Sequence, residues 1–488
     1  MKYIFILFSL FSFSQTITLS DADILAFPTA EGWGKNTTGG RGKAVFFVTN
    51  LNNSGAGSFR QIETDIENAN NGGNIIFRTG GIAEITSEVI FSLLNDDISF
   101  FGQSAPGDGF TIHGSGVNIR SENVQLRHIK FRNGLDTGKT SLTISAPNQN
   151  SIKTGYIFDH ISTTWGFDSG NFTISGNPND ELNSVSEMTL QNSIVAEHLS
   201  GKGTLLYGQA VTKISIINNA YVNNQSRVVT STVGLNNSYE LLNNYFYGLE
   251  GTQDMAPKNE VDAIGNIWIN GHGDNLNQTF RFNPCTTANC PPSGDSDYTG
   301  SKLYNEDNIF NGGAATLNTE ATNALVGSRI DASSYNARAS STVKQYVLDN
   351  AGARRNLEGL DNVDQHQMDD LNNGTTGAFY STQAQTVGLP SQASGTPYPD
   401  SDNDGLSDAY EAANGGTVTQ SVRPATAVIA DGRTVNQSGV TDYATTGYTH
   451  LEIFMADLAK DWDGYADDAV GGTAVSNPRA TNSALMNN

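Results

Sequence analysis

The stretch KISIINNAYVNN (residues 213–224) decides the fold of this chain. It contains two short runs in which apolar and polar residues largely alternate, and the pair Asn218–Asn219 separates them. Such alternation is typical of β-strands, and an Asn pair is typical of a bend. Five other stretches repeat this design: NVQLRHIKFRNG (123–134), TGYIFDHISTTWG (154–166), EMTLQNSIVAEH (187–198), YELLNNYFYG (239–248) and DAIGNIWING (262–271).

One polar residue at the bend gives the repeat its register. The spacings between successive bends are 31, 33, 27, 25 and 22 residues, counted over His128, Asp159, Asn192, Asn219, Asn244 and Asn266. An imperfect repeat of this length predicts a solenoid whose coils stack along one axis. We therefore predict an all-β fold, a right-handed parallel β-helix, in which the polar bend residues form a hydrogen-bonded ladder and do no chemistry.

Composition agrees with a turn-rich β protein and narrows the possible partners. The chain has 488 residues, of which 51 are Gly and only 16% are charged. Its length exceeds that of one ordinary globular core, which a repeat that grows along one axis explains. The net charge of −23 argues against nucleic acid or an anionic membrane as a partner, and it suits divalent cations or simply solubility. We expect a monomer.

The N-terminus, MKYIFILFSLFSFSQ, predicts export. One Lys, an apolar run and small polar residues form a signal peptide over residues 1–14, which is too short for a membrane anchor. We therefore expect a secreted protein, extracellular or periplasmic. In such an oxidising compartment, Cys285 and Cys290 of NPCTTANCPP are expected to form a local disulfide, because the loop offers too few ligands for a metal site.

The rest of the chain divides into unequal parts. We predict a β-helix domain over residues 22–390 whose C-terminal part is looser, with some helix in 313–350. A linker follows at 391–399, and a calcium-loop and tail region occupies 400–488. Within the tail, DWDGYADD (461–468) is interpreted as acidic surface.

The stretch DSDNDGLSDAYE (400–411) has the spacing of an EF-hand-type calcium loop. Carboxylates stand at alternate positions of the loop, with Gly405 at the sharp turn. Hard oxygen ligands at these positions can wrap a cation once the chain turns at that glycine. The predicted calcium ligands are Asp400, Asp402, Asp404, Asp408 and Glu411.

Lys202 and Arg227 are candidates for catalysis. They lie 25 residues apart, about one coil, and could therefore stand side by side on one face of a β-helix. Such a face suits β-elimination on a uronic acid polymer. There a base removes the proton on ring carbon 5, cations neutralise the carboxylate, and the oxygen on carbon 4 leaves.

Several segments resemble the bacterial pectate lyases of polysaccharide lyase family 1. They are AFPTAEGWGKNTTGGRGKAVFFVTNLNNSGAGSFRQ (26–61), FFGQSAPGDGFTIHG (100–114), FDHISTTWGFDSG (158–170), VNNQSRV (222–228), YELLNNYFYG (239–248), and the tail pair DSDNDGLSDAYEAANG (400–415) and GYTHLEIFMADLA (447–459). The resemblance covers roughly 26–275 and 396–460. It implies a pectate-lyase-like β-helix that cleaves pectate or a similar acidic polysaccharide with calcium as cofactor.

The resemblance also implies roles for single residues. Arg227 matches the catalytic arginine, thought to act as base, and Lys202 matches the lysine that binds the substrate carboxylate. Asp168 falls in a segment that supplies calcium ligands, and Asp136 lies near a second such position. The "DH" pair Asp159–His160, like His198, is assigned to substrate binding or to the scaffold of the site.

Some family positions are occupied by other residues here. Ser169 follows Asp168 where the family has Glu, and Val228 follows Arg227 where the family has Pro. These replacements leave two alternatives open: a lyase on a different uronan, or a non-catalytic β-helix that binds glycan. A β-helix glycoside hydrolase would need paired carboxylates facing the groove, for which the sequence provides no convincing pair.

Overall fold

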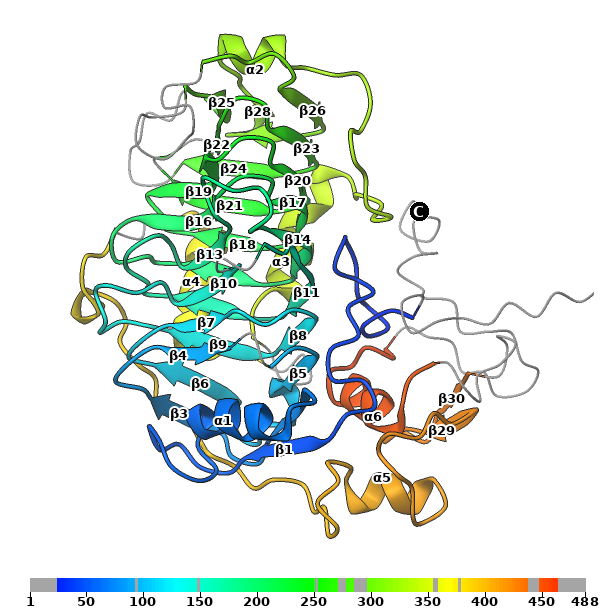
Figure 1. Cartoon of the computed structure of the whole chain (residues 1–488). Helices are drawn as coiled ribbons and strands as arrows, with labels where there is room; N and C mark the ends of the chain where they lie inside the picture. Colours follow the sequence, from blue (N-terminus) through cyan, green and yellow to red (C-terminus); the bar gives the residue numbers. More distant parts are fainter. Residues whose placement is uncertain are drawn as a thin grey trace, which may run out of the picture.

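The computed structural model describes residues 24–92, 95–146, 150–249, 251, 253–270, 278–284, 296–353, 359–375, 379–437 and 447–463. The chain forms a parallel β-helix, which confirms the predicted fold (Figure 1). Three sheets, here called A, B and C, run along the stack. Each full coil contributes one strand to each sheet in the order A, B, C.

Sheets A and B each contain ten strands. Sheet A consists of β1 (Val45–Val48), β2 (Gly73–Phe77), β5 (Ile98–Phe101), β8 (Val124–Arg127), β11 (Lys153–Asp159), β14 (Val185–Gln191), β17 (Thr212–Ile217), β20 (Ser238–Leu242), β23 (Glu260–Ile264) and β26 (Lys302–Glu306). Sheet B consists of β3 (Gly81–Glu84), β6 (Phe110–His113), β9 (Ile129–Arg132), β12 (Ser162–Thr164), β15 (Ile194–Ala196), β18 (Ala220–Val222), β21 (Tyr245–Leu249), β24 (Ile267–Asn270), β27 (Ile309–Phe310) and β28 (Gly313–Ala314).

Sheet C contains eight strands. They are β4 (Val89–Phe91), β7 (Val117–Ile119), β10 (Leu142–Ser145), β13 (Phe172–Ser175), β16 (Lys202–Tyr207), β19 (Ser226–Val233), β22 (Gln253–Met255) and β25 (Phe280–Phe282). The pair β29 (Thr426–Val428) and β30 (Thr434–Asn436) is separate and antiparallel.

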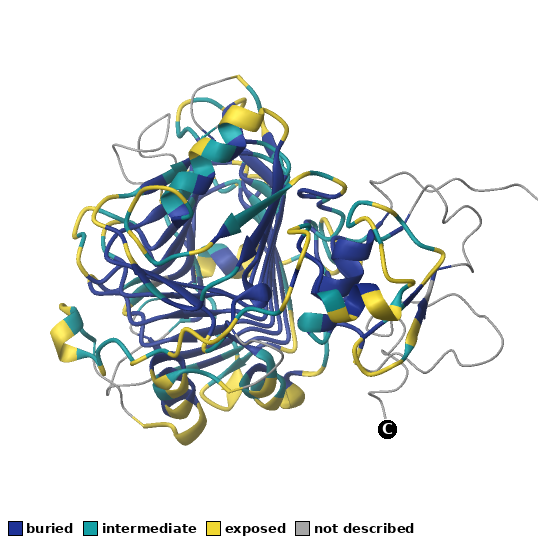
Figure 2. Cartoon of the chain, turned by 90° about the horizontal axis from the view of Figure 1, so that it is seen from below, coloured by how far each residue is buried: buried dark blue, intermediate teal, exposed yellow. Residues whose placement is uncertain are grey.

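Apolar side chains at equivalent positions of successive coils stack inside the helix. In sheet A, for example, Phe158, Leu190, Ile216, Leu241 and Ala263 are register partners, and all are fully buried. Removing this continuous column from water is what drives the coils together. Figure 2 shows the buried strands as stacked walls around the interior, with exposed positions in the helices and loops.

The predicted ladder of hydrogen-bonded asparagines is present at the bend from sheet A to sheet B in the later coils. Asn219, Asn244 and Asn266 are fully buried, and each side-chain oxygen accepts the backbone N–H of the preceding coil at 2.8–3.0 Å. Asn308 continues the row. The prediction that His128, Asp159 and Asn192 are equivalent to these asparagines was wrong. Asn192 has a left-handed backbone, as Asn218 has, so Ser193 stands in the ladder position, and Asp159 ends β11 opposite Gln191.

Short helices close both ends of the coil stack. α1 (Phe59–Ala69) lies at one end, and its buried Phe59, Ile62 and Ile66 pack against the core (Figure 1). α2 (Thr319–Asn323) lies at the other end and contributes Ala321. Together they shield the interior apolar column from solvent, as terminal caps of a solenoid must.

The segment after the last coil folds back along the outside of sheet B. α3 (Val343–Asn350) and α4 (Asn362–Asn373) place Val343, Val347, Met368 and Leu371 against the outward-facing residues of β15, β18 and β21. The helix expected within 313–350 is thus α2 and α3, and the 3₁₀ turn η3 (Ser340–Thr342) leads directly into α3. Two further 3₁₀ turns, η2 (Gly102–Ser104) and η4 (Gln383–Gln385), lie elsewhere in the chain.

Residues 400–437 and 447–463, here called the C-terminal unit, pack against the outside of sheet A. α5 (Asp408–Ala413) and α6 (His450–Leu458) share an apolar cluster with Ile76 of β2 and Phe101 of β5. Buried ion pairs also join the two parts, among them Arg41–Glu452 and Arg127–Asp461, each at 2.7 Å. The interpretation of DWDGYADD as acidic surface was therefore wrong for Asp461, which is buried.

Two predictions fall outside the described residues. These are the signal peptide at 1–14 and the disulfide between Cys285 and Cys290. Within the described part of the chain, no helix combines the length and the apolar character needed to cross a membrane.

Candidate active site

The turns from sheet B to sheet C form one row along the coil stack. Three successive turns, 133–141, 165–171 and 197–201, lead into β10, β13 and β16, and 223–225 leads into β19. Asp136 and Asp168 lie in the first two turns, Lys202 directly follows the third, and Arg227 is the second residue after the fourth. Because the strands pair in parallel register, all four predicted residues come to the same edge of sheet C. We call this edge the B–C ledge.

Lys202 and Arg227 occupy neighbouring strands at this ledge. Lys202 is the first residue of β16, and its register partner is Ser226, which directly precedes Arg227 in β19. The Ser226 hydroxyl donates to the Gly201 carbonyl at 3.0 Å, which ties the two strand starts together. The two backbones are thus one coil apart, as predicted from their spacing, whereas the side chain of Arg227 lies outside the described part of the structure.

The ammonium group of Lys202 is held at the surface by the turn of the preceding coil. Its Nζ donates to the backbone carbonyl of Asp168 at 2.6 Å. The carboxylate of Asp168 is exposed and accepts a hydrogen bond from Ser169. In this contact the lysine charge meets the dipole of a backbone carbonyl.

Asp136 lies on the same ledge but is engaged in its own turn. Its carboxylate accepts from Ser115 Oγ at 2.8 Å and from the backbone N–H of Gly138 at 3.1 Å. Two clusters of three or more acidic or His side chains that could share an ion occur among the described residues, and neither includes Asp136 or Asp168. Among the described residues, Asp136 and Asp168 thus belong to no ready-made group of three ion-binding side chains.

His198 connects two turns of the ledge and is almost fully buried. Its Nδ1 accepts the backbone N–H of Ser200 at 3.0 Å, so the proton resides on Nε2, which donates to the Phe167 carbonyl at 2.7 Å. The ring thereby fixes the turn that carries Asp168 against the turn that leads to Lys202. This placement favours the scaffold interpretation of His198 over substrate binding.

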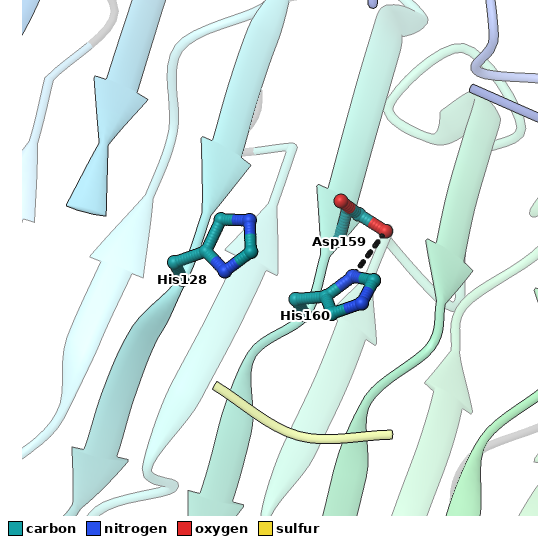
Figure 3. Close-up of side chains that lie close together, drawn as sticks. All are labelled: His128, Asp159 and His160. Atoms are coloured by element: carbon teal, nitrogen blue, oxygen red, sulfur yellow. Dashed lines mark hydrogen bonds and ion pairs between the residues drawn. The ribbon is translucent and has the colours of Figure 1, made fainter. Parts of the chain in front are cut away.

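Asp159 and His160 lie at the bend between sheets A and B, away from the ledge. The Asp159 carboxylate is fully buried and accepts from Arg127, His160 Nδ1, Gln191 and Asn192 at 2.7–3.1 Å. Figure 3 shows the bond from His160. Burial alone would raise its pKa, but His160 and Arg127 hold the pKa of Asp159 well below its usual range. Asp159 is therefore a charged and hydrogen-bonded part of the scaffold, with His160 among its hydrogen-bond donors.

This bend also forms one of the two clusters with ion-binding side chains, His128, Asp159 and His160. Figure 3 shows the two imidazole rings beside one another, with centroids 5.0 Å apart. Side-chain donors already occupy both oxygens of the Asp159 carboxylate: Arg127 bonds to Oδ2, and three further side chains bond to Oδ1. We therefore assign no metal to this cluster.

Sequence reasoning missed the buried amides that hold the ledge turns. The side-chain oxygen of Asn171 accepts the Gly166 N–H at 2.8 Å, and its amide donates to Asn224 Oδ1 at 3.1 Å. Asn224 in turn donates to the Val195 carbonyl at 2.7 Å. Asn171 just before β13 and Asn224 just before β19 were usable signals, but the repeat was counted on the other bend.

The second cluster with ion-binding side chains lies in the predicted calcium loop. The ligand oxygens of Asp400, Asp402 and Asp404 lie within 4.8 Å of one another, and Gly405 makes the sharp turn with φ 94°. Burial raises the pKa of Asp400, and burial together with the neighbouring carboxylates raises the pKa of Asp404. Such crowding of like charges is what a bound divalent cation relieves, so these three residues fit calcium.

The other two predicted ligands lie on α5. Burial, and then repulsion by Asp402, raise the pKa of Glu411, which places its carboxylate within the field of the cluster. Asp408 instead accepts hydrogen bonds from the backbone and side chain of Ser401, each at 2.8 Å. In the described geometry Asp408 thus closes the loop onto itself.

No family model matches the chain. Curated relatives do, among them "Probable pectate lyase C" of Aspergillus flavus, 30% identical over 451 residues, which cover 89% of this chain and 94% of that protein. The protein of the same name from Aspergillus fumigatus is 29% identical over 470 residues, 93% of this chain and 97% of that protein.

Solved structures also resemble the chain. Pectate lyase Bsp165PelA from Bacillus sp. N165, solved with trigalacturonate, has a TM-score of 0.46 and 17% identity, covering 66% of this chain and 98% of that one. The cedar pollen allergen jun a 1 has a TM-score of 0.47 and 15% identity, covering 66% and 92%.

The topology shows a parallel β-helix, and similarity to proteins called pectate lyase places the chain among the polysaccharide lyases. The chain belongs to the pectate lyase family, as its similarity to the full length of the Aspergillus flavus protein shows. The relatives named here are fungal, whereas the sequence motifs were compared with bacterial members, so the comparisons do not support a specifically bacterial affinity.

Proposed function

We propose that the chain is a secreted lyase that cleaves pectate or a pectate-like uronan by β-elimination. One observation carries the proposal: Lys202 and Arg227, the residues that match the family's catalytic pair, start neighbouring strands of sheet C. Relatives called pectate lyase C match this chain over nearly their full length, which supports the same reaction class.

In the proposed mechanism Lys202 binds the carboxylate of the uronate whose ring loses a proton. The proton on carbon 5 is removed only when the negative charge that develops on this carboxylate is neutralised. A surface ammonium that a backbone carbonyl anchors at 2.6 Å stands at the ledge, where it can meet that charge. Lys202 therefore stabilises the transition state by electrostatics.

Arg227 is the proposed base. It removes the proton on carbon 5, the electron pair forms the carbon 4–carbon 5 double bond, and the glycosidic oxygen on carbon 4 leaves. A guanidinium is ordinarily protonated, so the site must favour its neutral form. The positive charge of Lys202, which starts the adjacent strand, works in that direction.

We propose calcium as a structural ion of the 400–411 loop. Asp400, Asp402, Asp404 and Glu411 would hold it, and the ion would neutralise a crowded acidic turn. The proposed steps of the elimination use Lys202 and Arg227, and calcium is assigned to the loop, where the described carboxylates gather.

Product chemistry tests this function directly. The protein is incubated with pectate, methylated pectin and other uronans, and the ultraviolet absorbance and mass of the products are recorded. We expect unsaturated uronides from the wild type and at least a roughly hundredfold loss in Lys202→Met and Arg227→Ala. Lys344→Met, a basic residue on α3 outside the ledge, is the matched control.

The alternatives predict different results. A lyase on another uronan yields unsaturated product on that polymer alone. A glycan-binding protein binds a uronan without forming product, and this outcome, together with full binding by Arg227→Ala, would disprove the catalytic proposal. A hydrolase yields products without the double bond.

A further inference from the structure

Three successive strands of sheet B are followed by a residue with the same unusual backbone. Trp165, Glu197 and Asn223 come directly after β12, β15 and β18, which pair in register, and each has a left-handed conformation with φ between 50° and 58°. All three are buried, with at most 1% exposed. A large side chain such as that of Trp165 rarely adopts this conformation, which persists where surrounding contacts hold it.

These bend residues begin the turns of the B–C ledge. Glu197 begins the turn that leads to Lys202, and Asn223 begins the turn that leads to Arg227. The Trp165 indole N–H donates to Glu197 Oε2 at 3.0 Å, which joins two neighbouring turns. A shift of Glu197 or Asn223 therefore moves the start of β16 or β19, and with it one of the two basic residues.

α4 contacts the three bends one after another from the outside of sheet B. Val363 packs in an apolar cluster at the first bend. His366 Nε2 lies 3.7 Å from Glu197 Oε1 at the second bend. At the third bend, Asp370 Oδ2 accepts a hydrogen bond from the side-chain amide of Asn223 at 2.8 Å. The order of the contacts along α4 is thus the order of the coils.

The spacing of these contacts follows from the geometry of a helix beside a stack of strands. An α-helix rises about 1.5 Å per residue, so three residues span about 4.5 Å, close to the roughly 4.8 Å between neighbouring strands. Val363, His366 and Asp370 are separated by steps of three and four residues, which places them on one face of α4. The helix can therefore present one side chain to each successive coil.

The contacts at the second and third bends are connected to each other. Asp370 is only 5% exposed, and its Oδ1 accepts from Thr375 Oγ1 at 2.8 Å. His366 Nε2 lies 3.9 Å from Asp370 Oδ2, so this nitrogen is near the carboxylates of both Asp370 and Glu197. Hydrogen bonds to a charged carboxylate are stronger than neutral ones, which makes Asp370 the firmest of these anchors.

We propose that α4 positions the two residues of the proposed catalytic pair. Asp370 holds the bend that leads to Arg227, and His366 stands against Glu197 at the bend that leads to Lys202. The helix thereby fixes the starts of β16 and β19 relative to each other. Asp370 and His366 are positioning residues, since they act through the bends. The proposal rests on the proposed lyase function.

Kinetics on pectate test the effect on the reaction. We expect Asp370→Ala to lower kcat by about 10–100-fold and to change KM by less than about threefold, because misplaced catalytic groups weaken the transition state more than the binding of a long polymer. Asp370→Asn keeps an oxygen that can accept from Asn223 and should retain more activity. Asp369→Ala removes an exposed carboxylate from the same helix and should match the wild type. A wild-type kcat in Asp370→Ala would overturn the proposal.

Hydrogen exchange of backbone amides, measured without substrate, shows where the variant acts. In Asp370→Ala we expect faster exchange in residues 197–203 and 223–229 and wild-type rates in β5 and β8, at the other end of the stack. Unchanged exchange in the two turns, or a uniform rise along all coils, would overturn the proposal even for an active lyase. A wild type that forms no unsaturated product on any uronan refutes the lyase function instead, and the exchange still shows whether α4 holds the two turns.

Discussion

At the scale of single residues, His198 links the predicted chemistry to the fold. It is the buried side chain that holds the Phe167 carbonyl and the Ser200 N–H, on the turns next to Asp168 and Lys202. Since Lys202 itself is anchored on the Asp168 carbonyl, the position of its ammonium depends on the relative placement of these two turns. His198 is therefore a positioning residue for Lys202.

Replacing His198 should misplace Lys202 without unfolding the protein. We expect His198→Ala to lower kcat/KM on pectate by about 10–100-fold, because small errors in the position of a catalytic charge are costly. His198→Gln can still donate to the Phe167 carbonyl and should restore part of the activity. A loss of activity that is equal in both variants, or that merely follows a fall in melting temperature, would contradict the positioning role.

Asp159 makes the stability of the protein depend on pH. Its pKa in the folded protein is well below the value of about 3.9 in an unfolded chain. Its stabilising contribution is therefore fully present above about pH 4 and is lost as the pH falls through the folded-state pKa. We expect Asp159→Asn to cost about 3–5 kcal/mol of unfolding free energy at pH 7, because Arg127 loses a buried partner.

Denaturant unfolding at pH 7 and pH 3 measures this contribution. The difference between wild type and Asp159→Asn should shrink at pH 3. Asp349→Asn, which removes an exposed carboxylate on α3, should have little effect at either pH. A difference for Asp159→Asn that does not change with pH would show that charge is not what this residue contributes.

At the scale of elements, the bends could be predicted from the sequence only where successive coils use the same residue type in the same role. Asn219, Asn244 and Asn266 share one role, so their spacing revealed both the coil and the ladder. The earlier bends carry His128, His160 and Asn192 in left-handed conformations, and a count of polar residues slipped by one position there. The spacing of residues in the sequence predicts the length of a coil. Which residue type occupies a bend depends instead on its partner from another coil, as Asp159 depends on Arg127.

The same limit applies to the candidate site. The spacing of Lys202 and Arg227 was sufficient to predict that they stand one coil apart. Whether Asp136 and Asp168 assemble a metal site depends on side-chain directions within the ledge turns, which local hydrogen bonds to Ser115 and Ser169 decide. Sequence spacing does not contain that information.

The asparagine ladder predicts a local stability effect. Asn244 accepts from Asn219 and donates to both the Ile216 carbonyl and Asn266, all at 2.7–3.0 Å. Asn244→Ala would leave several buried polar groups without partners, and we expect a loss of roughly 2–4 kcal/mol in unfolding free energy. Asn236→Ala is the control, because Asn236 is exposed and bonds to Glu181 at the surface. Equal effects of the two variants would argue against the ladder as a stabilising element.

At the scale of the whole molecule, two of the three sheets support added structure. α3 and α4 cover part of sheet B, and the C-terminal unit covers the early strands of sheet A. The B–C ledge lies on the remaining side, at the edge of sheet C. The C-terminal unit is thus packed against the β-helix. The sequence did not predict this contact, because Arg41, Arg78 and Arg127 pair with acidic residues more than 300 positions away.

The calcium loop should control how firmly this unit is docked. Its Asp400 pairs with Arg78 at 2.8 Å, and Leu406 enters the apolar cluster with Ile76 and Phe101. We expect calcium at about 100 times its Kd to stabilise the folded protein by about 2.7 kcal/mol, and a chelator to lower the melting temperature accordingly. Asp402→Asn should lose this response, because Asp402 is exposed and lies within the carboxylate cluster.

Two comparisons separate docking from catalysis. Asp369→Asn, which removes an exposed carboxylate on α4, should respond to calcium as the wild type does. Initial rates on pectate at 25 °C, well below the melting transition, should be similar for Asp402→Asn and wild type, because the loop and the B–C ledge are separate parts of the fold. If calcium removal abolishes the rate of both proteins while the melting temperature of the wild type stays constant, then the ion acts at the ledge and the structural role of the loop is wrong.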